Sequence, residues 1–208
     1  MEFGQGTLED LAIMNSSLFN GVFNGKSVLV TGHTGFKGSW LTEWLLSLGA
    51  SVTGLSLPPD TEPSLFNELN LEKRISHHVG DIRDITGLQK VVEDCEPEFI
   101  FHLAAQPLVR LSYKDPVDTF ATNVMGLANI LDVARKSTSV KSFLVVTSDK
   151  CYNNVEWVWG YRETDAVGGK DIYSGSKGAA ELVIKSYLNS FFQDGKTQVR
   201  IGIGRAGN

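Results

Sequence analysis

Three glycines, each separated from the next by two residues, follow a short apolar run near the start of the chain. The run spans residues 26–31, and the glycines are Gly32, Gly35 and Gly38. Apolar residues with helical spacing then cover residues 39–48. In such a strand–loop–helix unit, the first glycine permits a tight turn, the second lets the backbone approach a pyrophosphate, and the third allows close packing of the helix. The free N–H groups at the helix start attract anions. We therefore predict a dinucleotide-binding loop, with a plain turn as the alternative.

The rest of the chain continues this alternation of strand and helix. Strands are expected at residues 51–55, 75–79, 98–103, 140–147 and 198–203. Helices are expected at residues 85–94, 115–136 and 172–192, with one helical turn at residues 65–69. The alternation predicts an α/β fold, a doubly wound parallel sheet of the Rossmann type with right-handed crossovers. We expect this domain to span residues 25–208, after a weakly ordered leader at residues 1–24.

Composition narrows the class of protein. The 208 residues suffice for one sizeable domain. A net charge of −5 without a Lys/Arg-rich run argues against nucleic-acid binding. No apolar run approaches the roughly 20 residues of a membrane span, and no secretory signal opens the chain. We expect a cytoplasmic protein with no membrane partner.

Neither the two cysteines nor the adjacent histidines His77 and His78 suggest a metal site. Cys95 and Cys151 lie far apart, without metal-ligand spacing, and are expected to be reduced thiols. His77 and His78 are adjacent, so in a strand they point to opposite faces, which favours a structural pair over metal ligands. No metal is therefore predicted.

Catalytic candidates follow the fifth expected strand. Tyr173 and Lys177 are four residues apart and share one face of a helix. An ammonium near a phenol lowers the phenol's pKa, so Tyr173 is predicted to act as a base toward a sugar hydroxyl. Ser148 is placed to hydrogen-bond that hydroxyl. Asp149 and Lys150 are either an acid and an amine that run an elimination or an exposed, solvated ion pair.

Three segments carry a resemblance to a known family. They are VTGHTGFKGSWL at residues 30–41, AAQPLVRLSY at residues 104–113 and TSDKCYNNVEWVWGYRE at residues 147–163. Together with the glycine spacing, they resemble the CDP-glucose 4,6-dehydratases within the extended short-chain dehydrogenase/reductase family. The resemblance runs from about residue 25 to residue 208 and implies NAD as cofactor and CDP-glucose as substrate.

The resemblance implies a reaction in three parts. Tyr173 takes the proton of the sugar 4-hydroxyl while NAD takes the C4 hydride. Lys150, or a group that it positions, helps to remove the C5 proton, and Asp149 protonates the departing 6-hydroxyl. The hydride then returns to C6, giving CDP-4-keto-6-deoxyglucose. Lys150 is either a neutral base with a lowered pKa or a charged stabiliser of the enolate.

The resemblance also implies binding residues. The cofactor-binding set is Gly32, Thr34, Gly35, Phe36, Lys37, Gly38, Asp81, Ile82, Leu103, Ala104, Ala105, Gln106, Asn123, Tyr173 and Lys177. The substrate-binding set is Arg110, Ser148, Arg205 and Asn208. Asp81 is alternatively a turn or helix-capping residue. Because Ser56, rather than an acid, ends the second strand, the residues themselves do not separate NAD from NADP. Trp157 and Trp159 are equally compatible with packing and with sugar contact.

The sequence stops at residues 205–208, inside a motif that the family continues. We therefore expect a fragment that lacks the C-terminal substrate half and full activity. The residues themselves do not give the oligomeric state. Relatives often dimerise through the helices that correspond to residues 115–136 and 172–192, so the resemblance implies a dimer or tetramer for the complete protein. Two other functions remain open: a nucleotide-sugar epimerase or reductase, and a non-catalytic dinucleotide sensor. The intact set of Ser148, Tyr173 and Lys177 argues against the sensor.

Overall fold

The computed structural model describes residues 18–193 and 197–207, and six parallel strands form one sheet within it. The strands are β1 (Ser27–Thr31), β2 (Ser51–Ser56), β3 (Ser76–Val79), β4 (Phe99–His102), β5 (Ser142–Ser148) and β6 (Arg200–Ala206). Their order across the sheet is β3-β2-β1-β4-β5-β6, so the winding direction reverses between β1 and β4. The predicted doubly wound parallel sheet is confirmed. Its reversal point is where such sheets bind ligands, at the carboxyl ends of the strands.

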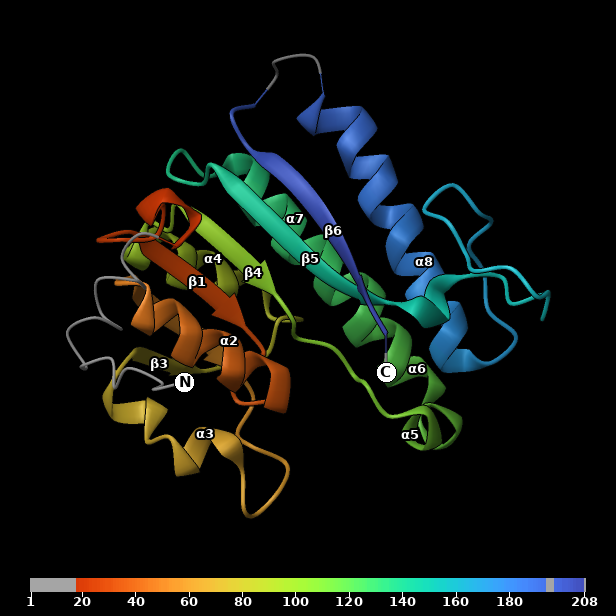
Figure 1. Ribbon diagram of the computed structural model, residues 1–208, viewed down its shortest axis with the longest axis horizontal. Helices are drawn as coiled ribbons and strands as arrows, with labels where there is room; N and C mark the ends of the chain where they lie inside the picture. The colour runs from red at the N-terminus through yellow and green to blue at the C-terminus, as the bar shows by residue number, and fades with distance from the viewer. Residues whose placement is uncertain (1–17, 194–196, 208) are drawn as a thin grey trace, which may run out of the picture.

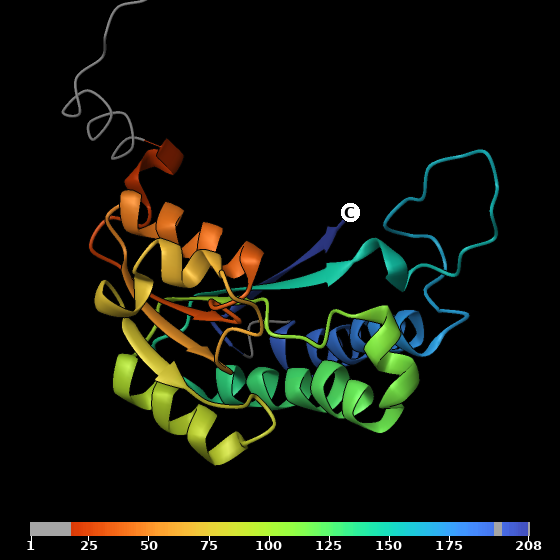
Figure 2. The ribbon, with the colours of Figure 1, turned by 90° about the horizontal axis from the view of Figure 1, so that it is seen from below.

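Helices cover the sheet on both faces (Figures 1 and 2). The α-helices are α2 (Phe36–Ser47), α3 (Leu65–Glu68), α4 (Ile85–Cys95), α5 (Val109–Lys114), α6 (Pro116–Phe120), α7 (Leu127–Lys136) and α8 (Ile172–Tyr187). The 3-10 turns are η1 (Leu18–Gly21), η2 (Leu71–Lys73) and η4 (Asp149–Cys151). In Figure 2, α2 lies on one side of the sheet, and α4, α7 and α8 lie on the other. Across the described ranges, none of these helices has both the length and the apolar composition that crossing a membrane requires.

Two predicted long helices are present, each with a π-helical segment. The first consists of α6, the π-helix η3 (Ala121–Gly126) and α7, and the second consists of α8 and the π-helix η5 (Leu188–Phe192). Single π turns inside helices commonly mark functional sites. The short helix α5 was not predicted, because six residues give too little periodicity to distinguish a helix from a loop.

The main core lies between the sheet and the helices α4, α7 and α8. Leu29, Ile100 and Phe143 from the strands are at most 1% exposed and pack with Ile130 and Ile184 from the helices. Burial of each such side chain contributes about 1.5–3 kcal/mol. The packing holds the carboxyl ends of β1, β4 and β5 in fixed positions, and α8 contacts β5 and the turn η4 that follows it.

The structure describes only part of the expected leader. Residues 1–17 lie outside the described residues. In residues 18–24, the ring of Phe23 lies 5.1 Å from that of Phe99 and the ring of Phe19 lies 5.6 Å from that of Trp44, between centroids. These two rings cover apolar surface beside β4 and on α2, and the weak order expected for the leader stays a prediction.

Candidate active site

The glycine loop joins β1 to α2 at the reversal point of the sheet. Gly32 has a φ of +77°, and a Cβ atom there would lie 2.6 Å from the backbone nitrogen of Ala104. A Cβ atom at Gly38 would collide with the carbonyl group of Gly32. Gly35 is the N-cap of α2 and provides no side chain to cap it. The free N–H groups of the first helical turn therefore remain available to an anion.

A pair of hydroxyls ties this loop to the end of β2. The Thr34 Oγ1 atom lies 2.7 Å from the Ser56 Oγ atom and donates to the Leu57 carbonyl at 2.9 Å. Ser56 occupies the place at which many dinucleotide folds carry an acid for the ribose. Thr34 therefore positions the loop through neutral hydrogen bonds.

His33 of the glycine loop pairs with His77, and sequence analysis missed this pairing. The His33 side chain is fully buried, and its Nε2 atom lies 2.7 Å from the Nδ1 atom of His77 on β3. Burial, together with the charge that His77 would carry, lowers the pKa of His33 to about 4. The pair is neutral near pH 7, in agreement with the structural role expected for His77. Nothing in the sequence pattern linked the two residues.

The segment after β4 is held by Asn123 of the π-helix η3. The backbone N–H of Gln106 donates to Asn123 Oδ1 at 2.8 Å, while Asn123 Nδ2 donates to the Gln106 carbonyl at 3.1 Å and to Ser176 Oγ at 2.9 Å. This network connects residues 103–106 with α8. Ala104 in that segment faces Gly32 of the glycine loop.

Asp81 lies after β3 in an ion pair. Its carboxylate accepts hydrogen bonds from the Arg83 guanidinium at 2.6, 2.9 and 3.0 Å, and Arg83 also pairs with Asp118. The hydrogen bonds from Arg83 lower the pKa of Asp81. The following residue, Ile82, is buried against Gly126. The arrangement supports a structural role, and adenine contact remains a prediction.

The end of β5 and the start of α8 bring Ser148 and Tyr173 together. Tyr173 is buried, and burial raises its pKa, while contact with Ser148 acts in the opposite direction. Burial also lowers the pKa of Lys177 to about 8. The Lys177 Nζ atom lies 5.8 Å from the centroid of the Tyr173 ring. The shared helix face is confirmed, but the predicted net lowering of the Tyr173 pKa is wrong, because burial of the phenol outweighs nearby positive charge.

Asp149 and Lys150 continue from Ser148 as the turn η4. Ser148 Oγ donates to Asp149 Oδ1 at 3.0 Å and accepts from the Lys150 backbone N–H at 3.2 Å. Lys150 Nζ donates to Asp149 Oδ2, also at 3.0 Å. Partial burial would raise the pKa of Asp149, but the hydrogen bonds from Lys150 and Ser148 lower it. The two side chains thus form a half-exposed ion pair in contact with Ser148.

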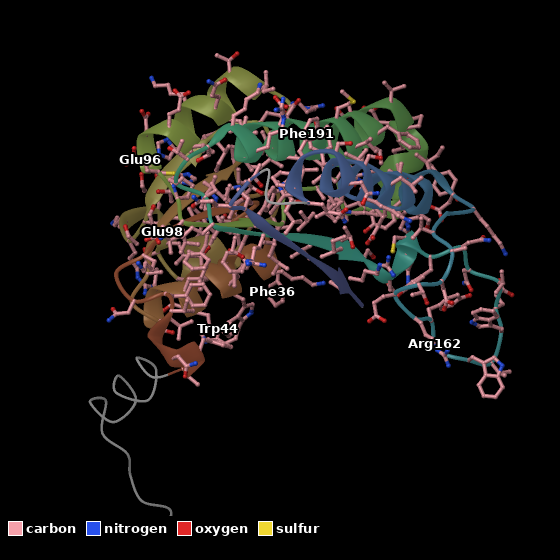
Figure 3. All side chains as sticks on the ribbon, turned by 90° about the horizontal axis from the view of Figure 1, so that it is seen from above. Phe36, Trp44, Glu96, Glu98, Arg162 and Phe191 are labelled. Carbon is pink, nitrogen blue, oxygen red and sulfur yellow. The ribbon has the colours of Figure 1, made fainter. Side chains whose placement is uncertain are left out.

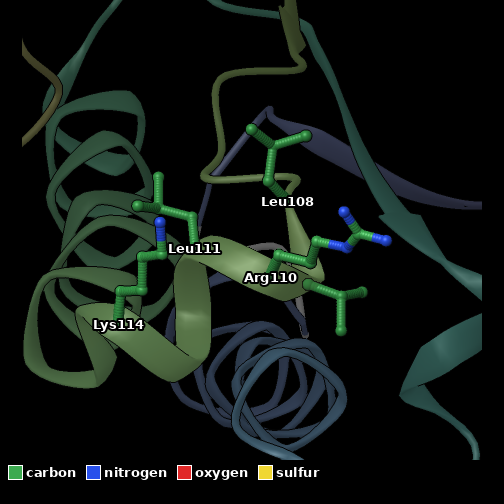
Figure 4. A pocket seen from close by; sticks show the side chains of 5 residues that line it. Leu108, Arg110, Leu111 and Lys114 are labelled. Atoms are coloured by element: carbon green, nitrogen blue, oxygen red, sulfur yellow. The ribbon is translucent and has the colours of Figure 1, made fainter.

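The predicted substrate residues are divided among different places. Arg110 lies on α5 and lines a cavity of about 420 Å³, with Leu108, Leu111 and Lys114 around it (Figure 4). Trp157 and Trp159 are exposed and line a second cavity, of about 380 Å³, with Arg162. Figure 3 shows Arg162 on the loop that stands away from the sheet.

Arg205, which is predicted to bind substrate, is held in an ion pair, and its contact with substrate stays a prediction. The Arg205 guanidinium forms two hydrogen bonds of 3.0 Å to the Glu181 carboxylate, because that buried acid requires a charged partner. Asn208 lies outside the described residues. Among residues 18–193 and 197–207, no group of three or more His, Cys, Asp or Glu side chains is arranged to hold a metal ion.

Comparisons with known proteins find relatives over most of this chain. Residues 29–194 match a protein-family model described as GDP-mannose 4,6 dehydratase. A CDP-glucose 4,6-dehydratase of Salmonella typhimurium is 50% identical over 89% of this chain and 53% of its own length. A GDP-mannose 4,6-dehydratase of Vibrio cholerae is 27% identical over 81% of this chain and 47% of its own length. The chain thus spans about half the length of these curated relatives.

Solved structures with the same fold include sugar-nucleotide epimerases. A UDP-glucose 4-epimerase of Thermus thermophilus in complex with NAD has a TM-score of 0.73 and 28% identity, over 86% of this chain and 54% of its own. A UDP-glucose 4-epimerase of Brucella ovis in complex with NAD has a TM-score of 0.75 and 23% identity, over 88% and 52%. The second likeness concerns the fold alone.

Proposed function

Because this chain belongs to the GDP-mannose 4,6-dehydratase family, we propose that the protein carrying it is a nucleotide-sugar 4,6-dehydratase that converts CDP-glucose to CDP-4-keto-6-deoxyglucose. One observation carries the proposal. The ion pair of Asp149 and Lys150 adjoins Ser148, which contacts Tyr173. A redox residue and an acid–amine pair therefore meet at one point, as oxidation followed by elimination requires. The 50% identity to a CDP-glucose 4,6-dehydratase supports CDP-glucose as the substrate.

The residues around the glycine loop fit NAD. Gly32 and Gly38 allow the close backbone packing that shapes the loop, since a Cβ atom at either would collide with backbone, and the start of α2 offers its N–H groups to a pyrophosphate. The segment of residues 103–106 would lie beside the ribose and nicotinamide. When bound, NAD supplies the acceptor for the C4 hydride and its later donor to C6. Every other task in the reaction falls to side chains.

Proton transfer from the sugar 4-hydroxyl falls to Tyr173. Burial raises the pKa of Tyr173 in the resting protein, so the phenol would first release its own proton to solvent, and the phenolate would then accept the proton of the 4-hydroxyl. Ser148 would share a hydrogen bond with the sugar 4-hydroxyl and hold it against the phenol oxygen. The buried ammonium of Lys177 favours the phenolate when the proton leaves, since charges interact more strongly away from water.

Proton transfer during the elimination falls to the Asp149–Lys150 pair. Asp149 is a carboxylate in the resting protein, because Lys150 and Ser148 lower its pKa. It must gain a proton before it can give one to the departing 6-hydroxyl. The carboxylate would accept the proton that leaves C5 and pass it to the 6-hydroxyl, which departs as water, so the substrate must loosen the ion pair. The hydrogen bond from Lys150 to Asp149 supports a charged Lys150 that stabilises the C4 enolate rather than a neutral base.

A turnover experiment tests the proposal. The purified protein is incubated with NAD and, in separate reactions, with CDP-glucose, GDP-mannose and UDP-glucose, and products are identified by mass spectrometry. We expect loss of one water from CDP-glucose and a 4-keto product that absorbs at alkaline pH. A product of unchanged mass with inverted C4 would establish an epimerase instead. Binding of NAD without conversion of any sugar nucleotide would favour the sensor.

We propose, in addition, that the protein forms a dimer through its long helices. Val117 on α6 is 78% exposed, Met125 on η3 is 59% exposed and Leu182 on α8 is 55% exposed. These apolar side chains lie on the two helices for which the resemblance implies self-association. Sedimentation equilibrium tests this directly: Leu182→Glu should lower the mass to that of a monomer, and an unchanged mass would contradict the proposed interface.

A further inference from the structure

Glu181 continues the row of catalytic candidates along α8. It lies four residues beyond Lys177 and eight beyond Tyr173, and residues at this spacing share one helix face. All three side chains are buried, and Glu181 is only 5% exposed. Burying an unpaired carboxylate is strongly unfavourable, so its position must be supported by partners. The reaction proposed above assigns no task to Glu181.

The partners of Glu181 come from the ends of two neighbouring strands. Thr147 Oγ1 donates to Glu181 Oε1 at 2.6 Å, and the Arg205 guanidinium donates to both carboxylate oxygens at 3.0 Å. Thr147 on β5 and Arg205 on β6 are paired in the sheet. Burial would raise the pKa of Glu181, but the hydrogen bonds from Arg205 and Thr147 lower it, so the group stays a carboxylate. One side chain thus fastens α8 to two strands.

Arg205 extends this connection to the loop after η4. Its guanidinium lies 4.5 Å from the centroid of the Tyr152 ring and donates to the Glu163 carbonyl at 3.3 Å. Tyr152 in turn stacks on Tyr161, with ring centroids 4.9 Å apart. Tyr152 directly follows η4, which contains Asp149 and Lys150. The fastening therefore reaches both groups of candidate residues.

We propose that Glu181 is a positioning residue that sets the distance between Ser148 and Tyr173, and that Arg205 serves Glu181 rather than the substrate. Ser148 is the residue after Thr147. Tyr173 is two helical turns, about 12 Å, from Glu181 along the same rigid helix. A shift of α8 against β5 at Glu181 would change the contact between the two hydroxyls. The inference rests on the proposed dehydratase function.

The test separates this inference from the proposed function. In the full-length protein, the rate of C4 oxidation is measured in a single turnover as NADH absorbance after mixing with CDP-glucose. Wild-type protein that forms no NADH would contradict the proposed function itself. If it does, we expect Glu181→Gln to slow oxidation about 10- to 100-fold, the effect of a misplacement of about 1 Å, and to change the KM for CDP-glucose less than 2-fold.

Two further variants decide the roles of the partners. Thr147→Val should slow oxidation in the same way, whereas Thr147→Ser, which keeps the hydroxyl, should retain most of the rate. This comparison tests the inference even if Glu181→Gln does not fold. Arg205→Lys should lower kcat with little change in KM. Glu43→Gln is the matched control, because Glu43 forms a bidentate ion pair with Arg74 away from the site. It should leave the rate of oxidation unchanged.

Two outcomes would overturn the inference. A wild-type rate in folded Glu181→Gln or Thr147→Val would show that the strand ends need no such fastening. A rise in KM with unchanged kcat in Arg205→Lys would show that Arg205 binds substrate.

Discussion

Replacing Lys177 by methionine should stabilise the protein while removing its activity. Lys177 is 7% exposed, and burial lowers its pKa from 10.5 to about 8. That change corresponds to about 3 kcal/mol of unfavourable free energy for the charged side chain in the folded protein at pH 7. Methionine fills similar volume without a charge, so Lys177→Met should raise the free energy of unfolding by about that amount.

The stability difference between Lys177→Met and wild type should depend on pH. Below pH 8, Lys177 is charged in both states, and the full penalty is present. Between pH 8 and 10.5, the folded protein loses the proton first, so wild-type protein gains stability relative to the variant. Above 10.5 both states are neutral and the penalty disappears. The advantage of Lys177→Met should therefore fall from about 3 kcal/mol at pH 7 to about 1 kcal/mol at pH 10.

Urea unfolding followed by circular dichroism at pH 7 and pH 10 measures both quantities. Lys150→Met is the matched control, because Lys150 is half-exposed and should change stability by less than about 1 kcal/mol at either pH. A less stable Lys177→Met at pH 7, or an advantage independent of pH, would refute the argument that Lys177 is held against a burial penalty.

Three further outcomes are expected. Tyr173→Phe should slow C4 oxidation by about 10²-fold or more while calorimetry shows CDP-glucose binding within a few-fold of wild type. Gly32→Ala should abolish NAD binding and lower the free energy of unfolding by at least about 1–3 kcal/mol, because the φ of Gly32 is +77° and the new Cβ would lie 2.6 Å from Ala104. Gly160→Ala is the control: a Cβ atom there would have nothing within 4 Å, so NAD binding and stability should stay unchanged. Asp149→Asn should still oxidise C4 but not lose the 6-hydroxyl, so NADH absorbance should persist; normal product formation would remove Asp149 from the mechanism.

The parts of the site that depend on backbone geometry could be predicted from the sequence. Each glycine of the loop stands where a Cβ atom would collide or where the helix begins, and such requirements are visible as glycine spacing. The order of strands and helices followed from hydrophobic periodicity. Like glycine spacing, hydrophobic periodicity is a property of residues close together in the sequence. The shared face of Tyr173 and Lys177 followed from their spacing in a helix.

Properties that depend on burial and on distant neighbours could not be predicted. Arg205 is bound by Glu181, which is 24 residues away in sequence, and a charged residue gives the same sequence signal whether it is buried or exposed. The pairing of His33 with His77 depends on the adjacency of β2 and β3. The pKa of Tyr173 depends on how deeply the phenol is buried, which its spacing from Lys177 does not reveal.

The fate of the C4 hydrogen tests the central claim most directly. CDP-glucose carrying deuterium at C4 is incubated with the protein and NAD, and the product is examined by nuclear magnetic resonance. A dehydratase that recycles its hydride within one site should place the deuterium at C6 of a 4-keto-6-deoxy sugar. Deuterium that remains at C4 of an inverted sugar, or that is lost from the sugar altogether, would contradict the account.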